Sequence, residues 1–155
     1  MNQAVPAPWQ PNWTSVTLAT TTIPAKPPGR ALWTLAADWI PGGVLLKIDA
    51  SRAAVWAYSD TADASCHADG HPQSLLTRTR CLVKTAPVGA LVGKIGGSSA
   101  GVSDGWRFVV GSQCMIRVPD HGGPLYLTIN DEFGGMDNNA REMFDVRVFQ
   151  SPAPP

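Results

Sequence analysis

The stretch Leu125-Tyr126-Leu127-Thr128-Ile129-Asn130 decides the fold, because large apolar residues occupy every second position along it. Successive side chains of a β-strand point to opposite faces of a sheet, so Leu125, Leu127 and Ile129 share one face. Residues 144–149 repeat this alternation near the end of the chain. Two strands that each carry one apolar face predict sheets that bury a common core.

Short strand-like segments occupy much of the remaining chain. Fifteen Gly and fourteen Pro residues are spread between them and leave little room for long helices. The further predicted strands are residues 16–22, 31–40, 44–50, 54–58, 88–95, 106–110 and 114–118. About eight or nine short antiparallel strands at this spacing predict an all-β fold, a jelly-roll-like β-sandwich. The polar residues between segments 44–50 and 54–58 suggest that these two form a hairpin.

The length of 155 residues suits one domain. We predict that residues 14–150 form the sandwich, between a proline-rich N-terminal segment at 1–13 and a proline-rich tail at 151–155. Trp9 and Trp13 suggest that the N-terminal segment docks on the domain. Two other tryptophans lie within strand patterns and are assigned to the core; they are Trp56 and Trp106.

The charge balance bears on partners and location. Twelve basic and twelve acidic residues cancel, and no Lys/Arg run occurs, which argues against nucleic acid as a partner. Near neutrality also removes one barrier to self-association. No apolar stretch approaches the roughly 20 residues of a membrane span. The first residues lack the pattern of a secretory signal. Cytoplasmic synthesis is the simplest interpretation, and export or surface display without a cleaved signal stays open.

Three cysteines make an odd count, so the chain is not a disulfide framework. Whether Cys66 and Cys81 pair is open. Cys114 lies in an apolar strand and is expected to pack as a small hydrophobic residue. The sequence Cys66-His67-Ala68-Asp69-Gly70-His71 contains zinc-ligand types, but its spacing matches no common zinc pattern. We interpret it as part of a polar loop.

The loop at residues 130–139 carries the clearest chemistry. It contains three carboxylates, three side-chain amides and two central glycines, and it lies between the two clearest strands. Calcium binds six to eight oxygen atoms of these kinds, so the loop is a candidate calcium site, although its spacing is not that of an EF-hand. Asn, Asp and Gly are also ordinary turn residues, and a plain turn is the alternative.

Catalytic motifs are not found in the sequence. Asp131 and Glu132 are a carboxylate pair of the kind that glycosidases use. Neighbouring side chains at a strand end usually point apart, however, and a calcium ion would occupy the aspartate. We therefore expect a non-catalytic protein, with a small hydrolase as the remaining enzymatic alternative.

Two segments resemble the calcium-dependent galactose-binding bacterial lectins of the LecA (PA-I) type. Residues 86–96, Ala-Pro-Val-Gly-Ala-Leu-Val-Gly-Lys-Ile-Gly, are close to the family's Gly-Ala-Leu-x-x-Lys-Ile-Gly strand, and residues 125–131 are followed by the Gly134 turn and the pair Asn138-Asn139. Weaker likenesses occur at residues 41–44, 56–58 and 66–70. Together they run from about residue 15 to residue 149.

The resemblance implies a set of calcium ligands. In such lectins one aspartate, two adjacent asparagines and two backbone carbonyls hold the ion. The matching positions are Asp131, Asn138, Asn139 and the carbonyls of Tyr58 and Gly135. Asp137 precedes the asparagine pair, and many relatives have Asp-Asn at this point. Asp137-Asn138 is therefore an alternative ligand pair.

The resemblance also implies a sugar ligand and an assembly. Sugar hydroxyls complete the calcium shell in these lectins, so Asp131 and Asn138 are expected to contact galactose, with His71 and Gln73 adding contacts from an earlier loop. Galactose-containing glycans are the expected partners, and a homo-oligomer, dimer or tetramer, is the expected state. The family's sugar-loop aromatic has no counterpart between residues 61 and 70. A LecA-like assembly or targeting module that binds no sugar, with structural calcium or none, is the alternative function.

Overall fold

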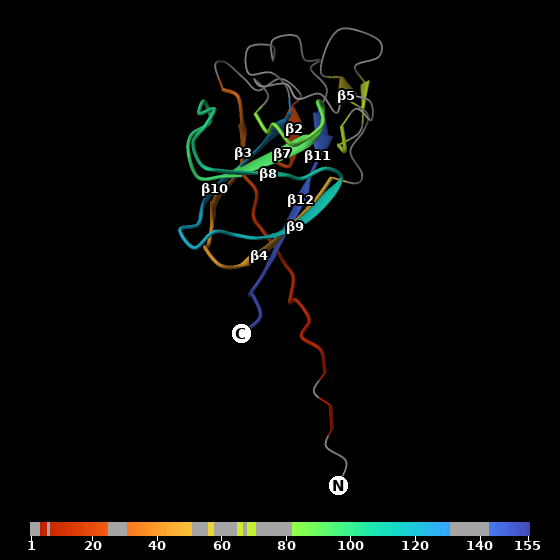
Figure 1. Cartoon of the computed structure of the whole chain (residues 1–155), viewed down its shortest axis with the longest axis vertical. Coiled ribbons are helices and arrows are strands. Elements are labelled where there is room, and N and C mark those ends of the chain that lie inside the picture. Colours follow the sequence, from red (N-terminus) through yellow and green to blue (C-terminus); the bar gives the residue numbers. More distant parts are fainter. Residues whose placement is uncertain are drawn as a thin grey trace.

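The computed structural model describes residues 4–5, 7–24, 31–50, 56–57, 65–66, 68–70, 82–130 and 143–155. No helix occurs in these ranges. The described residues include twelve strands, which form two four-stranded antiparallel sheets and two two-stranded ribbons (Figure 1).

The first sheet combines strands that are far apart in the sequence. Its order is β1 (Thr14–Ser15), β12 (Arg147–Ser151), β4 (Leu45–Asp49) and β9 (Gln113–Arg117). Strand β4 is central, and Lys47 lies opposite Phe149 on one side and Met115 on the other. Because β4 already has a neighbour on each side, the predicted hairpin between residues 44–50 and 54–58 is wrong.

The second sheet contains one strand from each of the two segments that carry the family resemblance. Its order is β3 (Thr34–Ile40), β10 (Gly123–Ile129), β7 (Leu91–Ile95) and β8 (Trp106–Val109). Strand β7 lies between β10 and β8. It passes so close to β8 that a Cβ added at Gly93 would lie 2.5 Å from the Phe108 ring. A glycine within a strand permits such a close approach, because it has no side chain to collide with the neighbouring ring.

The main core lies between the two sheets. One continuous cluster of buried residues joins Leu46 and Ile48 of β4 to Leu125, Leu127 and Ile129 of β10. Because side chains from both sheets fill it, the predicted all-β sandwich is confirmed.

A second, smaller cluster covers the outer face of the second sheet. It joins Trp33 and Val92 to Leu82, Val83 and Ala86 of the segment that precedes β7. Strand β7, in the interior of the second sheet, is therefore covered on both faces, which explains why every one of its residues is buried.

Two predicted strands do not form as single strands. Residues 16–21 are not a strand, so the prediction for 16–22 is wrong except at Thr22, where β2 (Thr22–Pro24) begins. This stretch crosses between the sheets: Val16 N–H donates to Val148 O in the first sheet, and Ala19 N–H donates to Ala36 O in the second.

The predicted strand at 144–149 is divided into two strands, β11 (Met143–Asp145) and β12. The break falls at Val146, whose N–H donates to Thr21 O. Strand β11 pairs with β2 in one two-stranded ribbon. The other ribbon pairs β5 (Trp56–Ala57) with β6 (Ser65–Cys66), which lies inside a predicted loop.

The tryptophans divide between docked and exposed positions. Trp13 packs on the first sheet with Lys47 Nζ 4.7 Å from its ring centroid, whereas Trp9 is 44% exposed. The expected docking of the N-terminal segment is therefore confirmed at Trp13. Trp106 is 38% exposed at the rim, so its assignment to the core is wrong; the side chain of Trp56 lies outside the described part of the structure.

Both termini leave the sandwich at the same end. Figure 1 shows the N-terminal segment extending beyond the C-terminus, while β2, β5 and β11 lie at the opposite end. The N-terminal segment joins the sandwich where Asn12 N–H donates to Ser151 Oγ at 2.8 Å. The described residues before this point, 4–5 and 7–11, lie largely exposed.

Candidate metal and sugar site

Every predicted calcium or sugar ligand lies outside the described residues. These are Tyr58, His71, Gln73, Asp131, Gly135, Asp137, Asn138 and Asn139. The structure does describe the residues that lead directly into three of these positions: Ala57 before Tyr58, Gly70 before His71, and Asn130 before Asp131. The structure therefore shows how the segments that precede the predicted ligands are arranged in the fold.

Ala90 pairs with both of the segments that lead into the predicted site, one ending at Asn130 and the other containing Asp69. On one side of it, Asn130 N–H donates to Ala90 O at 2.7 Å, and Gly89 N–H donates to Asn130 O at 2.7 Å. On the other side, Asp69 forms an antiparallel bridge with Ala90, and Leu91 N–H donates to Ala68 O at 2.8 Å. Asp69 and Asn130 thus flank one residue, roughly 10 Å apart across two strand spacings.

Residues 68–70 and β10 also run in the same direction. Residues 68–70 and β10 both run antiparallel to the chain at Ala90 and β7, so they run parallel to each other. The chain therefore leaves Gly70 and Asn130 toward the same end of the sheet. The approach to Tyr58 is connected to this region, because Ala57 pairs with Ser65, and β6 is followed two residues later by Ala68.

Asn130 has a structural role at the base of the loop. Its side chain is buried, and Oδ1 accepts the Val83 N–H at 3.0 Å. Its Nδ2 donates to the carbonyls of Val83 and Ala86 at 3.0 Å and lies 3.2 Å from that of Pro87. The carboxamide therefore holds residues 83–87 against the sheet. Among the three amides counted in this loop, that of Asn130 is thus committed to the protein backbone.

Asp69 also connects separate parts of the fold. Its Oδ1 accepts the Ser112 N–H at 2.7 Å, which ties residues 68–70 to the turn between β8 and β9. Gly111, in the same turn, has φ +65° and would bring an added Cβ to 2.7 Å from that oxygen. Within the described ranges, no group of three His, Cys, Asp or Glu side chains is placed to hold a metal ion.

Lys94, which belongs to the family-like strand, holds the neighbouring loop. Its side chain is fully buried, and Nζ donates to Ser98 O at 2.6 Å, Gly101 O at 3.1 Å and Asp104 Oδ1 at 2.8 Å. Burial lowers the pKa of Lys94, whereas the hydrogen bond from Lys94 lowers the pKa of Asp104. Trp33 Nε1 donates to the same Gly101 carbonyl at 2.9 Å.

The comparisons with known proteins add no relative. No family model matches the chain, and no curated protein matches its sequence. The family resemblance therefore depends on the motifs at residues 86–96 and 125–139. In the described ranges, no helix is long and apolar enough to cross a membrane.

The roles of Asn130 and Asp69 could not be read from the sequence. Asn and Asp are ordinary residues where a strand becomes a turn. Their partners, Val83 and Ser112, lie more than 40 residues away along the chain. Only the packed fold distinguishes these side chains from turn residues that face water.

Proposed function

We propose that this domain is a calcium-dependent carbohydrate-binding lectin, with galactosides as its sugar class. The observation that carries the proposal is the arrangement around Ala90, where the segments that precede His71 and Asp131 flank one residue and run in one direction. A shared site needs both loops at one end of the sheet, and the common direction of the two segments that precede them supports this.

The donor chemistry fits calcium. The proposed ligands supply a carboxylate from Asp131, amide oxygens from Asn138 and Asn139, and backbone carbonyls from Tyr58 and Gly135. All are hard oxygen donors, with no sulfur or imidazole among them, as calcium prefers. When bound, the ion would supply open coordination positions for two sugar hydroxyls.

The residues of the chain would orient the sugar. A carboxylate such as that of Asp131 accepts hydrogen bonds from hydroxyl groups, and the amide of Asn138 can donate and accept them. His71 and Gln73 would contact the same ring from the second loop. Asn130 would contribute by fixing the start of the calcium loop, because its buried side chain already holds residues 83–87.

Two measurements test the metal and the sugar separately. We expect calcium to raise the melting temperature, because a ligand at 100 times its Kd adds about 2.7 kcal/mol to stability. Asp131→Asn should remove that shift, while Asp120→Asn, in an exposed turn of the described structure, should keep it. Retention on immobilised galactose should require calcium and be reversed by chelator. Equal retention with and without calcium would refute the sugar mechanism, and no calcium shift would refute the metal site.

An assembly or targeting module is the second candidate. The observation that favours it is the exposed N-terminal segment with Trp9 at 44% exposure. A broad glycan array in millimolar calcium separates the two functions. Glycan binding would support the lectin, while a blank array together with an intact calcium shift would favour the module.

A further inference from the structure

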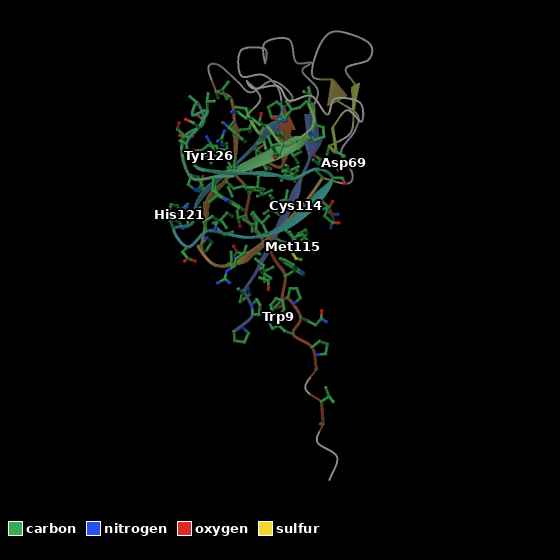
Figure 2. All side chains as sticks on the ribbon, in the orientation of Figure 1. Trp9, Asp69, Cys114, Met115, His121 and Tyr126 are labelled. Carbon is green, nitrogen blue, oxygen red and sulfur yellow. The ribbon has the colours of Figure 1, made fainter. Side chains whose placement is uncertain are left out.

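Exposed apolar side chains gather on two edge strands of the sandwich. Strand β8 is an edge of the second sheet and β9 is an edge of the first, joined by a short turn. They carry Trp106, Val109 and Met115, which are 38%, 40% and 62% exposed. Among the described strands, Trp39 is the one other large apolar side chain this exposed. Figure 2 marks Met115 on β9, beside the inward-facing Cys114.

The backbone of β9 presents a regular row of hydrogen-bonding groups. Ala50 N–H donates to Ser112 O at one end of the β4–β9 pairing, and Val118 N–H donates to Val44 O at the other. Hydrogen-bonded pairs alternate along an antiparallel ladder, so the backbone N–H and C=O groups of Cys114 and Ile116 also point toward β4. The N–H and C=O groups of Gln113, Met115 and Arg117 therefore point away from β4, where no described strand receives them.

We infer that β9 pairs with β9 of a second copy of this chain, antiparallel about a two-fold axis at Met115. In this register Met115 faces Met115 of the partner, and Gln113 faces Arg117 of the partner. All three residues with outward-facing backbone groups then form hydrogen-bonded pairs. The contact makes six backbone hydrogen bonds and joins two four-stranded sheets into one sheet of eight strands.

The side chains suit this register. Gln113, Met115 and Arg117 are all exposed on one face of the sheet, while Cys114 and Ile116 pack inward. The Gln113 amide oxygen can accept from the facing Arg117 guanidinium, so no like charges oppose each other at either flanking position. The two methionines meet at the centre and cover apolar surface that is open in the single chain. The chain's formal net charge of zero adds no long-range repulsion between copies.

The size of the contact sets its strength. Five residues on each side bury less than the roughly 1,600 Å² of a standard stable interface. We therefore expect a dimer that dissociates on dilution. The dimer would hold two copies of any ligand site in one particle, but it is independent of the calcium and sugar proposals.

Cysteine cross-linking tests the register. Facing residues of a hydrogen-bonded antiparallel pair have Cα atoms about 5.5 Å apart, within the range that a disulfide spans. Met115→Cys should therefore form a covalent dimer on mild oxidation. Gln113→Cys alone should not, because two copies of residue 113 would lie about 13 Å or more apart along the strands. A mixture of Gln113→Cys and Arg117→Cys should cross-link. Wild-type protein measures the background from its own cysteines.

Charge substitution at one position tests the interface in solution. Gln113→Glu places an acid opposite Arg117 of the partner and should tighten the dimer, whereas Gln113→Lys places like charges there and should weaken it by about tenfold. Sedimentation velocity over a concentration series measures both, and circular dichroism checks that both fold. A monomer at every concentration would overturn the proposal. So would a dimer indifferent to both substitutions, or equal cross-linking of Met115→Cys and Gln113→Cys.

Discussion

The side chain of Asn130 pairs with the backbone of Val83 as a neighbouring strand would: Oδ1 accepts the Val83 N–H and Nδ2 donates to the Val83 carbonyl, both at 3.0 Å. The two residues are 47 positions apart in the chain, and the contact is buried. It closes the smaller core cluster over the outer face of the second sheet.

Replacing Asn130 should therefore cost much of the stability. Asn130→Ala leaves the buried Val83 N–H and neighbouring carbonyls without partners, and we expect the free energy of unfolding to fall by about 3 kcal/mol. Urea unfolding measures the loss. Asn12→Ala, at an exposed asparagine, is the matched control and should stay within about 0.5 kcal/mol of wild type. A similarly small loss for Asn130→Ala would contradict the proposed role of this side chain.

The Lys94–Asp104 pair predicts a pH dependence. The hydrogen bond from Lys94 holds the pKa of Asp104 below its ordinary value of about 3.9. The unfolded chain therefore takes up a proton first as the pH falls, so this contribution is present above about pH 3.9 and is lost below it. Asp104→Asn should cost roughly 2 kcal/mol at neutral pH, less than a fully buried pair because Asp104 is partly exposed. The gap to wild type should narrow in acid, and a constant gap would argue against the pair.

The close approach of β7 to β8 predicts a coupled pair of substitutions. Gly93→Ala places a methyl group against the Phe108 ring and should destabilise the fold by about 1–3 kcal/mol. Phe108→Leu removes part of that ring, so the double variant should be more stable than the sum of the two single losses predicts. Thermal unfolding of all four proteins gives the coupling. Additive losses would mean that the ring moves aside freely.

The thiol of Cys114 should react slowly in the folded protein. Burial raises its pKa to about 11, so at pH 8 its thiolate fraction is about 100-fold smaller than that of a thiol with pKa 9. Alkylation by iodoacetamide, followed at the Cys114 peptide by mass spectrometry, should be slow until the protein is unfolded. Equal labelling rates in the folded and unfolded states would show that this strand opens readily.

The strand that the sequence predicted best, β10, packs one face against a single core. Leu125, Leu127 and Ile129 alternate because β10 keeps one face toward one core along its whole length. The predicted strand at 16–22 forms only at Thr22, and that at 144–149 is divided in two, because those segments change partners from one sheet or ribbon to another. The alternation of buried and exposed residues continues across the change of pairing partner, so the sequence pattern does not reveal where that change occurs.

Residue type alone also fails to assign roles within the candidate site. The composition of residues 130–139 predicts oxygen ligands, but it does not separate Asn130, whose amide holds the backbone, from Asn138 and Asn139. The amide group is the same in all three residues. What differs at Asn130 is the buried backbone of residues 83–87 beside it, which depends on a tertiary contact.

Both ends of the chain emerge from the side of the sandwich opposite β2, β5 and β11 (Figure 1). A tag, fluorophore or solid support attached at either end would therefore stand away from β2, β5 and β11. Surface-based measurements can use such an attachment with little steric interference. In a fusion, the extended N-terminal segment would serve as a built-in spacer between the domain and whatever carries it.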